Sequence, residues 1–144
     1  MAPAPARRLF TALLLCGVSP AAATACSGHP SAGPPGPGIV RLDDKANGTT
    51  VRVPLGTTVV LTLGSTYWSA PVSSVPGVLS STASASASAD HSCMAGMGCG
   101  TLQEVLRAAD PGTTQLSSSR VSCGEAMSCP PDRRRFTVTV IVAQ

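Results

Sequence analysis

The chain has 144 residues, enough for one domain, with ten Lys and Arg, seven Asp and Glu, and a formal net charge of +3. So weak a positive balance gives no electrostatic footprint for DNA or RNA, and we expect no nucleic-acid partner. The one basic run, Arg133 to Arg135, has no interleaved aromatic residues and is expected to be a solvated loop before a strand.

The first 25 residues have the organisation of a secretory signal peptide. Arg7 and Arg8 precede the apolar run Leu9 to Val18, and small residues follow, ending in Ala23-Thr24-Ala25. The apolar run is about half the length that spans a bilayer, so we expect a cleaved leader over residues 1–25 and no permanent transmembrane helix. The protein is therefore expected to be exported.

Cys26 directly follows the leader, and the preceding triplet resembles a bacterial lipobox, although leucine usually stands where Ala23 is. Lipidation of Cys26 would leave Cys93, Cys99, Cys123 and Cys129, an even set that suits an oxidising compartment. Ordinary cleavage after Ala25, which would leave Cys26 as an incidental thiol, is the alternative. We expect lipidation of Cys26, and hence a protein anchored on the outer face of the cell membrane.

Residues 26–38 form a linker between this anchor and the folded domain. Ser27 to Gly38 reads SGHPSAGPPGPG, in which proline and glycine alternate with almost nothing to bury. Such a segment combines stiff polyproline stretches with flexible joints, which is suitable for a tether that holds a surface domain away from a membrane.

From Ile39 onward the apolar residues recur with a period of two, which indicates strands. Thr50 to Val53 alternates, Pro54-Leu55-Gly56 predicts a turn, and Thr58 to Leu63 predicts a buried strand. Further strands are expected over Thr113 to Ser119, after the turn at Asp110-Pro111-Gly112, and over Phe136 to Val142, with Phe136, Val138, Val140 and Val142 on one face. Short strands at this spacing predict that residues 39–144 form an all-β, immunoglobulin-like sandwich of about seven strands.

Tyr67 and Trp68 are the only Tyr and Trp of the chain. Neighbours on a strand point to opposite faces, so we expect Trp68 in the core and Tyr67 near a loop rim. An exposed Tyr at such a rim would suit an anchor for a protein partner.

Two segments are ambiguous. Ser80 to Ala89 alternates serine with alanine and offers little to bury, which indicates a loop or a loosely held edge. Thr101 to Ala109 has capping-box spacing at Thr101 and Glu104, and Leu102, Val105, Leu106 and Ala109 fall on one helical face. Alternation of the same residues allows a strand instead.

The stretch from Gly48 to the C-terminus resembles the chagasin-type inhibitors of papain-like cysteine peptidases. Gly48 to Leu63 is similar to the family's opening hairpin, Gly98 to Thr101 to its glycine-rich second loop, Asp110 to Thr113 to a turn, and Arg135 to Val140 to its closing strand. The resemblance implies an Ig-like sandwich with three contact loops at one end, and it implies a strand over Leu102 to Ala108.

The contact loops themselves depart from the family pattern. The family's first loop, of Asn-Pro-Thr-Thr-Gly type, is replaced by Gly64-Ser65-Thr66 running straight into Tyr67, so we expect that loop to be missing or very short. The family's third loop, with Arg-Pro-Trp, is matched only at Arg120. The candidate binding residues are Ser65, Thr66, Tyr67, Gly98, Gly100, Thr101 and Arg120.

Both remaining cysteine pairs have the spacing Cys-x5-Cys. We expect disulfides rather than free thiols, with Cys93–Cys99 and Cys123–Cys129 as the simplest pairing and bonds between the two loops as the rival. A copper site would use His91, Cys93, Met94, Met97, Cys99 and Met127, since soft sulfur ligands suit Cu(I). The spacing matches no zinc signature, and we expect no metal and no cofactor.

No catalytic residue is predicted. No serine lies in a Gly-x-Ser-x-Gly turn, and both histidines, His29 and His91, lie outside the predicted strands. We therefore expect a monomeric, non-enzymatic binding module with an unidentified protein partner at the cell surface. The alternatives are a working inhibitor of cysteine peptidases and a copper-binding envelope protein.

Overall fold

The computed structural model describes residues 36–144. The predicted signal peptide, the lipidation of Cys26 and most of the tether lie outside the described residues, so these remain predictions. None of the helices within the described range is long and apolar enough to cross a membrane.

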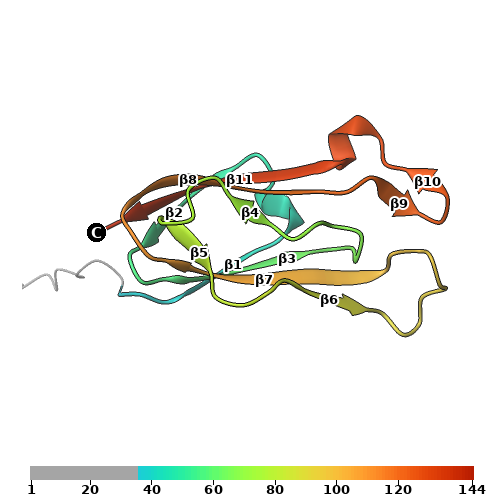
Figure 1. The fold of residues 1–144 in the computed structure, drawn as a ribbon, viewed down its shortest axis with the longest axis horizontal. Coiled ribbons are helices and arrows are strands. Elements are labelled where there is room, and N and C mark those ends of the chain that lie inside the picture. Colours follow the sequence, from blue (N-terminus) through green and yellow to red (C-terminus); the bar gives the residue numbers. More distant parts are fainter. Residues whose placement is uncertain (1–35) are drawn as a thin grey trace, which may run out of the picture. The chain divides into compact units, whose positions relative to one another are not determined.

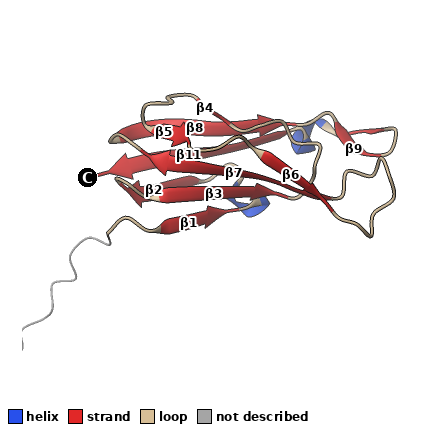
Figure 2. Ribbon diagram, turned by 60° about the horizontal axis from the view of Figure 1, so that its bottom comes forward, coloured by secondary structure: helices blue, strands red, loops and turns tan. Residues whose placement is uncertain are grey.

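The described residues form two β-sheets packed face to face, as Figures 1 and 2 show. The five-stranded sheet has the order β1 (Ile39–Leu42), β3 (Thr58–Leu63), β7 (Gly100–Ala108) and β5 (Leu79–Ser81), with β6 (Ser86–Ala89) also paired to β7. The four-stranded sheet has the order β2 (Thr50–Pro54), β11 (Arg135–Ala143), β8 (Gly112–Ser119) and β4 (Val72–Ser73). The expected all-β sandwich is confirmed.

Four smaller elements complete the domain. β9 (Ser122–Gly124) and β10 (Met127–Ser128) form a separate antiparallel hairpin. The 3-10 helix η1 (Asp44–Ala46) follows β1, and the 3-10 helix η2 (Pro131–Arg133) precedes β11. The hairpin and the short edge strands make the structure richer in strands than the expected seven.

The core lies between the sheets and follows the alternation of the sequence. In β11 the side chains Phe136, Val138, Val140 and Val142 are all buried, as expected, while the residues between them are half-buried. In β3, which lies between β1 and β7, the side chains Val59, Val60, Leu61 and Leu63 are buried. Trp68 belongs to the same core cluster and is 7% exposed, which confirms its expected position.

The ambiguous segment 101–109 is a strand. β7 pairs with β3 from Leu63↔Leu102 to Thr58↔Arg107, and on its other side with β5 and β6. Its inward face carries Leu102, Glu104, Leu106 and Ala108. The local helical pattern is overruled because the central strand gains partners on both edges, which an isolated helix would not have.

The expected opening hairpin is wrong. β2 pairs in parallel with β11, whereas β3 pairs with β1 and β7, so the turn between them crosses from one sheet to the other. The turn itself bonds to both sheets: the Leu55 N–H donates to the Ala143 carbonyl at 2.7 Å, and the Gly56 N–H donates to the Ala108 carbonyl at 2.8 Å. Gly56 has φ +80°, a conformation that glycine adopts without strain.

Ser80 to Ala89 contributes two edge strands rather than a loop. β5 pairs with residues 106–108 of β7 and β6 with residues 100–103. Every residue of β6 is exposed, so the expectation of a loosely held edge describes this segment well.

Candidate functional site

Three loops lie at the end of the sandwich opposite the turn between β2 and β3. The first loop, residues 64–71, joins β3 to β4; the second loop, residues 90–99, joins β6 to β7; the third loop, residues 120–134, joins β8 to β11 and contains the β9–β10 hairpin. In Figure 1 the second and third loops extend together beyond the sheets. We call this end of the domain, formed by residues 64–71, 90–99 and 120–134, the loop end.

The first loop is longer than expected, because Tyr67 and Trp68 lie in a turn and do not begin a strand. It is fixed at its start by Asp44, whose Oδ2 accepts from the Gly64 N–H at 2.8 Å. The Thr66 N–H and the Ser65 hydroxyl both donate to the Gly98 carbonyl, at 3.0 Å and 2.9 Å. The first loop is therefore tied to the second.

Tyr67 and Gly98 make the closest contact between these two loops. The Tyr67 hydroxyl donates to the Gly96 carbonyl. A Cβ added to Gly98 would lie 2.2 Å from Cε2 of Tyr67, so the ring occupies the space that any other side chain would need. Gly98 also has φ +68°, so both the contact and the backbone require glycine here.

The second loop is closed by the Cys93–Cys99 disulfide. At its start, Asp90 Oδ1 accepts from the Ser92 N–H at 2.9 Å and from the Ser92 hydroxyl at 2.7 Å. These hydrogen bonds, the backbone one first, hold the pKa of the Asp90 carboxyl below its ordinary value. The loop therefore has a defined conformation although most of it is exposed.

The third loop is closed by the Cys123–Cys129 disulfide across the β9–β10 hairpin. Arg134 fixes its base, with Nε donating to the Cys129 carbonyl at 2.6 Å. Ala126, in the turn of the hairpin, has φ +52° and is the only residue other than glycine with a positive φ in the described chain. Both disulfides have the local pairing expected as the simplest.

All the candidate binding residues except Arg120 fall into two groups. Ser65, Thr66, Tyr67 and Gly98 come together where the first loop meets the second. Gly100 and Thr101 begin β7, and Gly100 is needed there because an added Cβ would lie 2.1 Å from the Ser88 carbonyl oxygen.

Arg120 has a supporting position in the third loop. Its guanidinium lies over the Trp68 ring, 4.4 Å from the centroid, and its Nε donates to the Arg133 carbonyl at 3.0 Å. These contacts tie the base of the third loop to the core.

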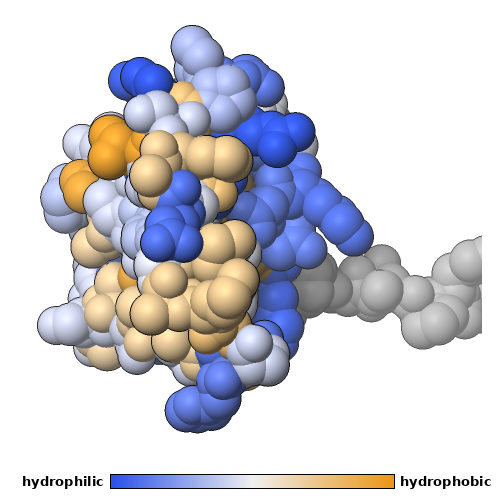
Figure 3. Space-filling view, turned by 90° about the vertical axis from the view of Figure 1, so that its right-hand side faces the viewer, coloured by the Kyte–Doolittle hydropathy of each residue, from blue (hydrophilic) through white to orange (hydrophobic). Residues whose placement is uncertain are grey.

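Sequence reasoning missed an exposed apolar surface at the tip of the loops. Met94 is 74% exposed, Met127 62% and Met97 39%, and we call these three side chains the methionine face. Figure 3 looks onto this end of the domain and shows apolar surface across its middle, broken by a few hydrophilic side chains. The sequence did hold a signal, since every methionine after Met1 lies between a pair of disulfide-forming cysteines.

The second and third loops also touch each other. A Cβ added to Gly96 would lie 3.7 Å from Cγ of Glu125, an ordinary van der Waals distance. A hollow of about 230 Å³ lies beside the contact between the first and second loops and is lined by Thr66, Tyr67, Ala89, Asp90, Met94, Gly98 and other residues of the second loop. The three loops therefore present one connected surface.

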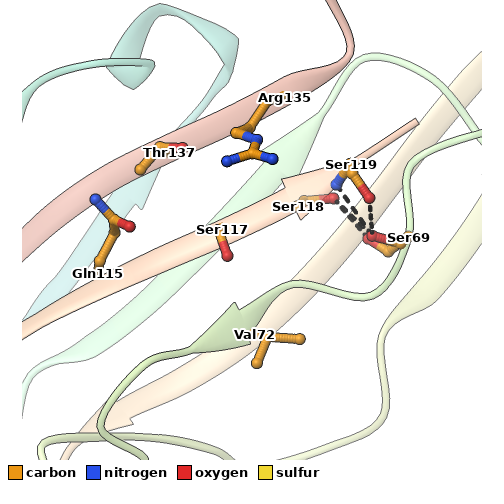
Figure 4. Close-up of a pocket in the computed structure, with 8 residues that line it drawn as sticks. All are labelled: Ser69, Val72, Gln115, Ser117, Ser118, Ser119, Arg135 and Thr137. Carbon is orange, nitrogen blue, oxygen red and sulfur yellow. Dashed lines mark hydrogen bonds between the residues drawn. The ribbon is translucent and has the colours of Figure 1, made fainter. Parts of the chain in front are cut away.

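Another hollow, of about 290 Å³, lies on the outer face of the four-stranded sheet. Figure 4 shows its lining: Ser69, Val72, Gln115, Ser117, Ser118, Ser119, Arg135 and Thr137. Hydrogen bonds from Ser118 and Ser119 to Ser69 use several of these polar groups internally. Small-molecule sites are mostly apolar with a few polar groups, and this hollow has the reverse composition.

The Cys93–Cys99 disulfide removes both thiolates from the set of copper ligands considered above. Within residues 36–144 no group of three or more His, Cys, Asp or Glu side chains is arranged to hold a metal ion.

Comparisons with known proteins identify the fold. No protein-family profile and no curated sequence matches the chain. Among solved structures, the cysteine protease inhibitor EhICP2 from Entamoeba histolytica is similar, with a TM-score of 0.55 and 16% identity over 76% of this chain and all of that one. The solution structure of amebosin is similar with a TM-score of 0.50 and 21% identity, over 75% of this chain and all of that one. The described domain thus shares its fold with EhICP2 and amebosin, which is the fold that the resemblance to the chagasin-type inhibitors implied.

Proposed function

We propose that this protein is an inhibitor of cysteine peptidases that binds the peptidase with the three loops at one end of the sandwich. The observation that carries the proposal is the gathering of these loops, two of them closed by disulfides, on a fold shared with the inhibitor EhICP2. This function is preferred to that of a binding module with an unidentified partner.

The physical basis is preorganisation. A loop already held in its bound conformation loses little conformational entropy when it enters a cleft, so more of the contact energy appears as affinity. The disulfides, the hydrogen bonds between the first and second loops, and the stacking of Arg120 on Trp68 hold the backbone of the loop end. The family's contact sequences are absent, so affinity must come from other exposed side chains of these loops.

Titration of papain with the full chain, solubilised in mild detergent, tests the proposal. We expect stoichiometric, reversible inhibition at sub-micromolar concentrations. Full papain activity at a large molar excess of the protein would contradict it and would leave a non-inhibitory binding module as the better function.

A matched pair of variants tests where the peptidase binds. Met97 in the second loop and Leu55 in the turn at the opposite end are each 39% exposed. We expect Met97→Asp to weaken inhibition by about tenfold or more, since a charge in an apolar contact is costly to desolvate. Leu55→Asp should leave inhibition unchanged. Equal effects of the two variants would count against binding through the loop end.

We further propose that the inhibitor is exported and acts as a monomer at the cell surface, anchored by a lipid on Cys26. The leader-like segment before Cys26 and the proline- and glycine-rich segment after it support this placement. The intact mass of the protein extracted from the cell envelope is the test. A lipid mass on an N-terminal Cys26 is expected, and an unmodified Cys26 would support ordinary cleavage.

A further inference from the structure

We infer that the methionine face is the part of the loop end that fills apolar subsites of the peptidase cleft, and that peroxide oxidation of these thioethers switches the inhibitor off. This inference rests on the proposed function and deepens it. Met94, Met97 and Met127 would then supply much of the binding energy, and peroxides would regulate binding by oxidising them.

The distribution of methionines within the chain is the first support. The chain has four methionines, and the three after Met1 all lie inside the two disulfide-closed segments. None of these three side chains is buried, so they do not serve the core. An exposed apolar group on a soluble domain has a hydration cost that is removed when a partner covers it.

The contrast between backbone and side chains is the second support. Gly96 and Gly98, both with positive φ, shape the backbone of the second loop, and a disulfide closes it. Methionine side chains on such a rigid base remain flexible and polarisable, which lets them fill irregular apolar pockets. The loop end therefore combines a fixed frame with adaptable contacts, and it fits a groove that is apolar at its floor.

The lack of other apolar anchors is the third support. The only Trp is in the core, and Tyr67 uses its hydroxyl on the Gly96 carbonyl and its ring against Gly98. Both aromatic residues that commonly dominate binding surfaces are thus engaged within the domain. Of the remaining loop-end side chains, the methionines and the 77% exposed Val121 offer the largest apolar contact area.

The same exposure makes the thioethers accessible to peroxides. The sulfur of each methionine attacks one peroxide oxygen, the O–O bond breaks, an S–O bond forms, and water leaves; sulfur is oxidised by two electrons and the peroxide is reduced. The sulfoxide is polar and disrupts a methionine-rich interface, and reductases can reverse the change. The cysteines of these loops are already disulfides and offer no thiolate for the same oxidant.

The test compares the full chain with a triple variant, Met94→Leu, Met97→Leu and Met127→Leu. Leucine keeps the apolar volume but has no sulfur to oxidise. Both proteins are treated with hydrogen peroxide, the peroxide is removed with catalase so that the thiol of papain is not oxidised, and papain inhibition is measured. Mass spectrometry counts the oxygen atoms added at each methionine, and circular dichroism verifies that the fold is retained.

The triple variant should still inhibit papain, since leucine keeps the apolar volume, but its untreated inhibition can differ from that of wild type because all three positions lie in the contact surface. Each protein is therefore compared with its own untreated sample. After peroxide, wild type should weaken by about tenfold or more because a polar sulfoxide must be desolvated in the contact, while the variant should not change. Wild type that keeps its inhibition with all three methionines oxidised would overturn the inference and leave the proposed function intact. An equal loss in both proteins would also overturn it, because another site would then be responsible. If untreated wild type does not inhibit papain, the proposed function fails and the inference fails with it.

Discussion

Replacing Gly98 with alanine tests whether the first and second loops form one unit. An added Cβ would lie 2.2, 2.3 and 2.9 Å from three atoms of the Tyr67 ring, and the backbone has φ +68°. The backbone of Gly98 cannot shift freely to relieve the contact, because Thr66 and Ser65 both donate to the carbonyl of Gly98 itself.

The cost has two parts. An L-residue in the left-handed region is less stable than glycine by about 1–2 kcal/mol. Tyr67 must also move away, which breaks its hydrogen bond to the Gly96 carbonyl and costs about 0.5–1.5 kcal/mol more. Since Tyr67 is only half-buried, its ring can swing outward, and we expect a total of about 2–3 kcal/mol rather than the full penalty of overpacking a core.

Urea denaturation of the two proteins, followed by circular dichroism, measures this difference in the free energy of unfolding. Gly124→Ala is the matched control, because Gly124 lies in the disulfide-closed third loop and has no positive φ. A Cβ added to Gly124 would lie 3.9 Å from its nearest neighbouring atom. The control should change stability by less than about 0.5 kcal/mol. If Gly98→Ala is as stable as the control, the contact between the loops is not as the structure describes it.

Three further predictions concern the same loops. Replacing Cys123 and Cys129 by serine should lower the free energy of unfolding by about 2 kcal/mol, the loop-closure entropy of a short loop, in thermal or urea denaturation; no change would mean that the disulfide does not restrict the unfolded chain. Ala126→Gly should raise stability by about 0.5–1 kcal/mol, because relief of the φ +52° conformation outweighs the greater freedom of glycine in the unfolded state, and a loss of stability would argue against that conformation. Because hydrogen bonds from Ser92 lower the pKa of Asp90, the turn at the start of the second loop should open with a midpoint below pH 3.8, as the pH falls through the lowered pKa. An NMR titration of the Ser92 amide signal with its midpoint at or above pH 3.8 would contradict this.

How much of the fold the sequence predicts depends on how local the determining contacts are. Residues 136–142 alternate strictly, and that period alone places four side chains on the core face of β11. Residues 101–109 fit both a helix and a strand, and only pairing with β3 on one side and β5 and β6 on the other decides for the strand. Here the family resemblance supplied what local periodicity could not.

The turn at residues 54–57 shows what a local sequence signal leaves undetermined. Its proline and glycine correctly predict a change of direction, but a turn signal does not state which strands pair on each side of it. The parallel pairing of β2 with β11 depends on residues about ninety positions away, and this places β2 and β3 in different sheets.

The structure brings several of the candidate binding residues together at one end of the sandwich, while their role in binding stays a prediction. The resemblance placed Ser65, Tyr67 and Gly98 at one end of the sandwich, and hydrogen bonds join them there. The exposure of Met94 and Met127 could not be predicted, because the burial of a side chain in a short loop depends on what packs over it. The same is true of Arg120, whose stacking on Trp68 requires two segments fifty residues apart to meet.

Hydrogen–deuterium exchange on a mixture of this protein with papain shows directly whether the loop end is the peptidase-binding surface. We expect papain to slow exchange at backbone amides of residues 64–71, 90–99 and 120–134, and to leave exchange in the turn at residues 54–57 and in β8 unchanged. Protection confined to the sheet faces or to the opposite end, or no protection at all, would contradict it.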